Sequence, residues 1–113
     1  MHDSAPGTTP QVIDEMVRRI VSSFAPEKVI LFGSYARGEA GPDSAVDLLV
    51  ILRGPLQKRG KRLAIRARLH GMGMAKDVVV VTPEEVEAHK DLAGSIVRPA
   101  LLEGRVLYDR TAA

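Results

Sequence analysis

The first part of the chain carries an apolar pattern with a helical period. Over residues 12–24 the apolar side chains recur at three- and four-residue spacing, which is typical of an amphipathic helix of about four turns. Thr9 and Pro10 supply the expected N-cap and first helical position, and Ala25-Pro26 supplies the expected end. The pattern therefore predicts a helix with one buried side.

Three later runs have the length and composition of strands. Each is short, apolar and rich in β-branched residues, and together they are residues 28–32, 46–52 and 76–81. In the second run, alternation puts Asp47 on the same face as Leu49 and Ile51, whereas the opposite face is entirely apolar.

Helical segments are expected between these strands. Residues 35–38 can form a short helical turn, and residues 56–71 a basic helix. The inner side of that basic helix is expected to carry apolar residues, namely Leu63, Ile65, Leu69 and the alanines.

The C-terminal third is expected to alternate helices with one strand. Thr82, Pro83 and Glu85 form a capping-box pattern that predicts a helix to about residue 90. A last helix over residues 95–103, ended by Gly104, precedes a short strand at residues 106–108. The whole order predicts an α+β fold, close to α/β, with a small mixed β-sheet flanked by helices.

Length and composition narrow the class of protein. The 113 residues are expected to form a single domain, 1–113, with a flexible N-terminus over residues 1–8. The chain has no cysteine, which excludes disulfides and thiolate metal sites, and no apolar run approaches the roughly 20 residues that span a bilayer. The N-terminus lacks the pattern of a signal peptide, so a cytoplasmic protein without membrane contact is expected.

Positive charge is concentrated in one segment. The net charge is only +2, yet Arg53 to Lys76 contains eight Lys or Arg residues and no acid. Such a segment is often a solvated helix face, but it could also meet nucleotide phosphates, nucleic acid or an acidic protein. No aromatic residue is interleaved with these charges, so direct binding of nucleic acid is not expected.

A carboxylate inside a core strand is the main chemical signal. Asp47 interrupts an apolar run, and such a charge is costly unless it is compensated, for example by a metal ion. The preceding strand ends at Gly33-Ser34, where a small turn could hold a phosphate. A plain turn and a solvated edge-strand acid are the structural alternatives.

This stretch resembles the active-site signature of the DNA polymerase β-like nucleotidyltransferases, and most closely their minimal members, the MNT proteins. The family pattern is Gly-Ser, ten residues, then Asp-x-Asp on a strand, with a third acid on a later strand. Here Gly33-Ser34 is followed by ten residues and then by Ala45-Val46-Asp47. Similarity extends roughly from Val12 to Tyr108 and implies the polymerase β-like fold.

The resemblance implies roles for specific residues. Gly33, Ser34 and nearby amides would bind the nucleoside triphosphate, with Arg37 as a further phosphate ligand or a partner of Glu39 or solvent. Asp47 would be a catalytic metal ligand in a site that holds two Mg²⁺ ions in intact members.

Two further positions bear on catalysis. By the resemblance, Asp77 would be the third acid, either a general base or a metal ligand, although an ordinary surface acid is the alternative. Asp43 is a nearby carboxylate outside the motif. Ala45 stands where the family has its first catalytic Asp, either because the chain is an engineered variant or because it is a naturally degenerate member.

The resemblance also implies a partner. Many minimal members resemble antitoxins of HEPN–MNT toxin–antitoxin pairs, which transfer AMP from ATP to a tyrosine of a HEPN ribonuclease. The expected function is that of such an antitoxin, in a hetero-oligomer with its HEPN toxin and with catalysis impaired by Ala45. The alternatives are a non-catalytic antitoxin that neutralises the toxin by binding, and a standalone transferase acting on a small molecule.

Overall fold

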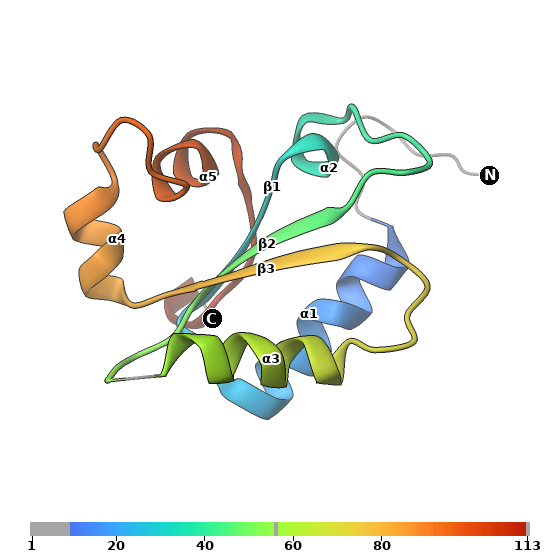
Figure 1. Cartoon of the computed structure of the whole chain (residues 1–113), viewed down its shortest axis with the longest axis horizontal. Helices are drawn as coiled ribbons and strands as arrows, with labels where there is room; N and C mark the ends of the chain where they lie inside the picture. Colours follow the sequence, from blue (N-terminus) through green and yellow to red (C-terminus); the bar gives the residue numbers. More distant parts are fainter. Residues whose placement is uncertain (1–9, 56, 113) are drawn as a thin grey trace.

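The computed structural model describes residues 10–55 and 57–112, and its centre is a four-stranded sheet in the order β3-β2-β1-β4 (Figure 1). The strands are β1 (Lys28–Phe32), β2 (Val46–Ile51), β3 (Lys76–Val81) and β4 (Arg105–Asp109). β2 runs antiparallel to β1 and parallel to β3, and β4 runs antiparallel to β1. The mixed sheet confirms the predicted α+β fold.

Helices cover the two faces of the sheet unequally. One face packs against α1 (Gln11–Phe24) and α3 (Lys58–Arg68), which lie together below the sheet in Figure 1. The other face packs against α5 (Val97–Glu103) and, in part, α4 (Pro83–His89). The single turn α2 (Ser34–Arg37) follows β1, and the 3₁₀ turn η1 (Arg110–Ala112) closes the described chain.

The first predicted helix is confirmed, with one correction at its start. Its inner side is buried as the spacing predicts, and Ala25 ends it in a left-handed conformation. Pro10 is the N-cap rather than the first helical residue, and its carbonyl accepts from the Ile13 and Asp14 amides. Thr9, and the predicted flexible segment 1–8, lie outside the described residues.

The basic helix needs a larger correction. α3 is shorter than predicted, and the predicted start at Leu56 lies outside the described residues. Ile65 and Leu69 are fully buried, whereas Leu63 is 55% exposed and the alanines also face solvent. The inner side is therefore narrow, because Ile65 and Leu69 are four residues apart and share one side of the helix, whereas Leu63 lies on another side.

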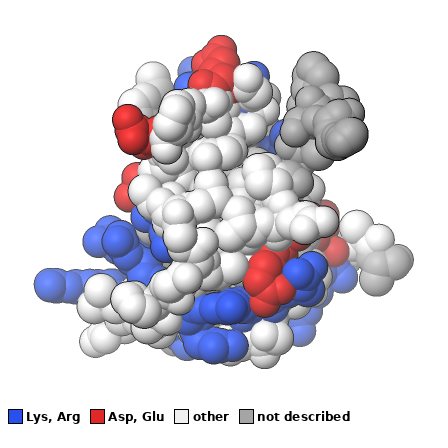
Figure 2. Space-filling model, turned by 90° about the vertical axis from the view of Figure 1, so that its right-hand side faces the viewer, with Lys and Arg blue, Asp and Glu red and all other residues white. Residues whose placement is uncertain are grey.

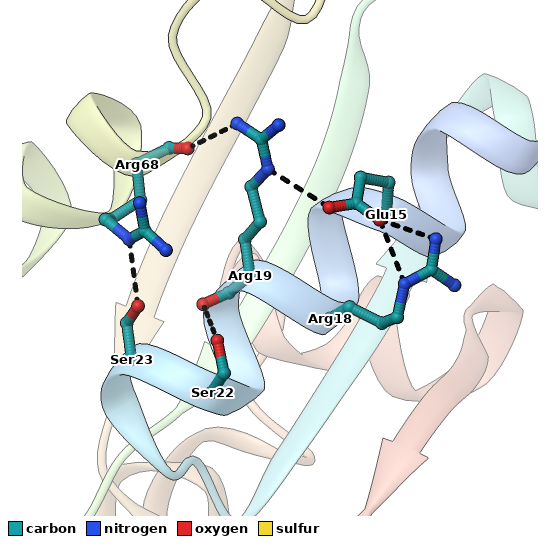
Figure 3. Close-up of polar contacts among 6 residues, drawn as sticks. All are labelled: Glu15, Arg18, Arg19, Ser22, Ser23 and Arg68. Carbon is teal, nitrogen blue, oxygen red and sulfur yellow. Dashed lines mark hydrogen bonds and ion pairs between the residues drawn. The ribbon is translucent and has the colours of Figure 1, made fainter.

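A polar network joins α1 to α3 across their solvent side (Figure 3). Arg19 donates from Nη1 to the Arg68 carbonyl at 3.1 Å and from Nε to Glu15 at 3.2 Å. Arg68 in turn donates from Nε to Ser23 Oγ at 2.9 Å. The basic residues of these two helices thus help to fix how the helices lie against each other.

The C-terminal third follows the sequence closely. Thr82 and Glu85 form the predicted capping box at the start of α4, with Pro83 as the first helical residue. The last helix begins at Val97, two residues later than predicted.

Gly104 ends that helix as predicted, and the reason is close contact rather than a left-handed backbone. Its φ is −75°, but a Cβ at this position would overlap the Ala100 carbonyl and lie 2.6 Å from Ile30 Cγ2. Only glycine, which has no Cβ, allows the chain to pass this closely from α5 into β4. None of the helices in the described ranges is long and apolar enough to cross a membrane.

Candidate active site at the end of β1 and β2

The turn after β1 has a backbone that only glycine adopts readily. Gly33 has φ 75° and ψ −154°, a region essentially reserved for glycine, and its carbonyl accepts from the Ala36 and Arg37 amides at 3.1 Å each. A Cβ on Gly33 would overlap the Oδ2 atom of Asp47. The turn therefore lies directly against the carboxylate that the sequence singles out.

Strand register brings two of the predicted acids together. Phe32, the last residue of β1, is paired with Asp47, and Asp47 is in turn paired with Asp77 on the parallel strand β3. Residues opposite one another on neighbouring strands share a face, so both carboxylates lie on the side of the sheet that carries α5. The predicted alternation is confirmed, since Leu49 and Ile51 belong to the apolar cluster of that same face.

The two carboxylates lie in different surroundings. Asp47 is half-buried on an inner strand, which removes the alternative of a solvated edge-strand acid, whereas Asp77 is exposed on the edge strand. Burial raises the pKa of the Asp47 carboxyl, the Asp77 charge raises it further, and Arg37 acts in the opposite direction. A cation beside this pair would relieve both unfavourable effects at once.

Arg37 is held by carboxylates on two sides. Its Nε donates to Glu39 at 2.9 Å, and its Nη1 donates to Glu103 of α5 at 3.2 Å. These hydrogen bonds raise the pKa of Arg37 above its ordinary value. Glu39 was an expected partner, but Glu103 lies 66 residues away and no sequence signal points to it.

The remaining predicted residues lie around the same corner. Ser34 is the first residue of α2, directly after Gly33, and is partly buried. Ala45 is partly buried immediately before β2 and carries no carboxylate, while Asp43 is exposed in the loop. A separate groove of ≈ 990 Å³ between α1 and β4 includes none of these residues, so that groove lies apart from the candidate site.

A model of the nucleotidyltransferase domain family matches residues 13–107, which is most of the chain. The chain belongs to the nucleotidyltransferase family. Members of this family use a nucleoside triphosphate and a divalent metal ion.

This nucleotidyltransferase is similar to one named relative in sequence and to two solved structures in fold. It is 31% identical over 105 residues to the "Putative protein adenylyltransferase MJ1305" of Methanocaldococcus jannaschii, covering 88% of this chain and 71% of the relative. A chain from a crystal structure of a toxin–antitoxin with AMP-PNP superposes with a TM-score of 0.62 at 18% identity, covering 88% of this chain and 75% of the other. A mutant of the toxin–antitoxin MntA-HpeT gives 0.58 at 17% identity, covering 93% and 76%. The two structural likenesses show a shared fold.

The donor set of the nucleotidyltransferase fits a divalent cation only in part. Asp47 and Asp77 offer oxygen ligands at paired positions, as Mg²⁺ prefers. Across residues 10–55 and 57–112, however, no group of three or more acidic or histidine side chains could hold a metal ion. Water and nucleotide oxygens would therefore have to complete the coordination shell of such an ion.

Proposed function

We propose that this nucleotidyltransferase is the antitoxin of a toxin–antitoxin pair, and that the reaction of its site is transfer of AMP from ATP to a tyrosine hydroxyl of a HEPN ribonuclease toxin. The supporting observation is the juxtaposition of the Gly33-Ser34 turn with the paired carboxylates Asp47 and Asp77. Similarity to a named protein adenylyltransferase and to toxin–antitoxin structures supports the choice of a protein as acceptor.

The proposed reaction breaks a phosphoanhydride bond of ATP and forms a phosphoester bond to the acceptor tyrosine. The tyrosine oxygen forms a bond to the α-phosphorus of ATP, the bond from that phosphorus to the bridging oxygen breaks, and pyrophosphate leaves. Ser34 and the turn amides bind the triphosphate, and Asp77, exposed at the sheet edge, accepts the hydroxyl proton. Asp47 and Asp77 would hold Mg²⁺, which supplies polarisation of the phosphate oxygens when bound.

Arg37 has a role in this proposal that requires it to change partners. In the structure its guanidinium is paired with Glu39 and Glu103, so it contacts a phosphate only after at least one of these pairs opens. Both pairs are solvent-exposed and individually weak, so a triphosphate with its larger charge can compete for the guanidinium.

Ala45 favours a second candidate function. Without a carboxylate at this position the site offers two acids instead of three, and the chain would neutralise its toxin by binding rather than by modification. We propose that catalysis in this chain is impaired and that the partner contact is retained, because an interface of ordinary size does not depend on one metal ligand. Among the candidate functions, we therefore rank the binding-only antitoxin beside the catalytic antitoxin and above the small-molecule transferase.

Two measurements test the proposal. Calorimetry with a non-hydrolysable ATP analogue and Mg²⁺ is expected to detect weak binding to the chain and its loss in Ser34→Ala. Co-expression with a HEPN-type partner is expected to give a single hetero-oligomeric peak in size-exclusion chromatography. If the chain elutes alone beside an intact partner, the antitoxin function is wrong, whereas absence of nucleotide binding at millimolar ligand contradicts the site itself.

A further inference from the structure

Strand β3 forms one edge of the sheet, and its outer side is bordered by grooves on both faces. β3 pairs only with β2 within the described residues, so one of its sides keeps its backbone donors and acceptors unused by the sheet. On the α3 side a groove of ≈ 460 Å³ is lined by Arg59, Arg62 and residues 78–80. On the opposite side a groove of ≈ 430 Å³ is lined by residues 79–81 and 92–97, together with Lys58, Glu85 and His89.

The groove on the α3 side is basic. A second groove of ≈ 490 Å³ lies further along α3 and includes Arg66, His70 and Lys76. Within the described part of the chain, no acidic side chain pairs with Arg59, Arg62 or Arg66. Figure 2 shows Lys and Arg side chains gathered on the lower part of the molecule, where α1 and α3 lie. This side of β3 therefore attracts negative charge.

The groove on the opposite side of β3 exposes apolar side chains, and Lys58 and Glu85, which also line it, pair with each other. Leu92 is 53% exposed and Ile96 is 46% exposed, and both line this groove together with Val79. Exposed apolar residues that gather beside an open strand edge, rather than singly, are typical of a contact surface. The two sides of the β3 edge thus differ, since one carries unpaired arginines of α3 within the described residues and the other carries exposed Leu92 and Ile96.

We propose that β3 binds an extended segment of the acceptor protein as a fifth strand, with acidic and apolar residues alternating along that segment. Side chains of an added strand point alternately to the two faces of the sheet, so the acidic ones meet the α3 arginines and the apolar ones meet Leu92 and Ile96. This inference rests on the proposed function, in which the acceptor is a protein.

A peptide strand fits this surface better than a nucleic acid does. The grooves contain no Phe, Tyr or Trp side chain on which a base could stack, and the side that faces Leu92 and Ile96 exposes apolar residues. The unused backbone groups of β3 match the donors and acceptors of another strand.

The outer edge of β3, which we call the docking edge, leads to the candidate site. Asp77 is the second residue of β3, so a segment paired along the strand ends beside the Asp47–Asp77 pair. Neighbouring strands lie about 4.8 Å apart, which places the end of the added segment within side-chain reach of these carboxylates. The edge would thereby bring an acceptor hydroxyl to the candidate site.

Synthetic peptides of roughly eight residues, matched to ordinary strand length, test this inference on the full chain. A labelled peptide of alternating Glu and Val is compared by fluorescence anisotropy with a matched Lys–Val peptide and a single-stranded oligouridine. We expect only the Glu–Val peptide to bind and to slow hydrogen exchange of β3 amides. The double variant R62E/R66E should weaken it by about tenfold or more, and Ile96→Ser by several-fold.

Arg18→Glu is the matched control, because Arg18 is an exposed arginine on α1 that borders β4 at the opposite edge of the sheet. It should leave peptide affinity unchanged. Equal binding of the Glu–Val and Lys–Val peptides, or preferential binding of oligouridine, would overturn the inference. If no peptide binds while the ATP analogue still does, the docking edge is wrong and the proposed nucleotide site stands.

Discussion

The two faces of the sheet are built from alternate residues of the same strands, yet one is wholly core and the other carries the candidate site. The face under α1 and α3 is continuous core, with Val46, Leu48 and Val50 of β2 all fully buried. The opposite face is apolar near α5 but ends in Asp47 and Asp77 beside the Gly33 turn. One face gives stability, and the other gives up part of its burial to hold a pair of carboxylates.

On the face that carries Asp47 and Asp77, the largest expected effect of a substitution is a change in activity. Ala45→Asp should raise AMP transfer by about 10²–10³-fold or more, because a third carboxylate restores electrostatic stabilisation where negative charge develops in the reaction. The measurement is transfer from α-labelled ATP to the HEPN-type partner with Mg²⁺ present. Ala45→Asn is the control of equal size without the charge, and equal transfer by all three forms would contradict the proposed impairment.

On the face under α1 and α3, the largest expected effect of a substitution is a loss of stability. Leu48→Ala should lower the free energy of unfolding by about 2–5 kcal/mol, because it removes a fully buried side chain between β2 and its covering helices. Urea unfolding measures the loss. Leu101→Ala, at a 38% exposed position, removes the same atoms and should cost much less. Similar costs for both would contradict the division between core and surface.

The Gly33 turn allows the two properties to be disturbed together. Gly33→Ala should cost about 1–3 kcal/mol from its backbone conformation, with additional displacement of the Asp47 carboxylate that its Cβ would overlap. Thermal unfolding and calorimetry with the ATP analogue should both worsen. Gly41→Ala, where a Cβ has nothing within 4 Å, is the matched control and should change neither.

The smallest expected effect is the pH dependence of stability caused by Asp47. Because the pKa of this carboxyl is raised in the folded protein, the folded state binds more protons and stability falls as pH rises from about 4 towards the raised pKa. Asp47→Asn should therefore stabilise the chain, and by more at neutral pH than at acid pH. Urea unfolding of both forms across this range measures the difference in the free energy of unfolding. A constant or opposite difference would show that the folded state does not disfavour the charged form of Asp47.

Much of the fold was predictable because its signals are local. The helical spacing of residues 12–24, the capping box of Thr82 and Glu85, and the β-branched run at residues 76–81 each depend on neighbours in sequence. The inner side of α3 was predicted wrongly, because Leu63 lies two residues before Ile65 and therefore on a different side of the helix, where no other element covers it. Spacing shows which residues share a helix side, whereas packing decides which side is buried.

By itself the sequence determined the strands, the Gly33-Ser34 turn and the family to which the motif belongs. Tertiary structure decided that Asp47 and Asp77 face each other, because parallel pairing in register brings together residues separated by a whole helix. It also decided that Glu103 holds Arg37 and that the basic helix α3 borders an open strand edge. These relations join distant segments, and their distances are fixed by the packing of the sheet and its helices rather than by any local pattern.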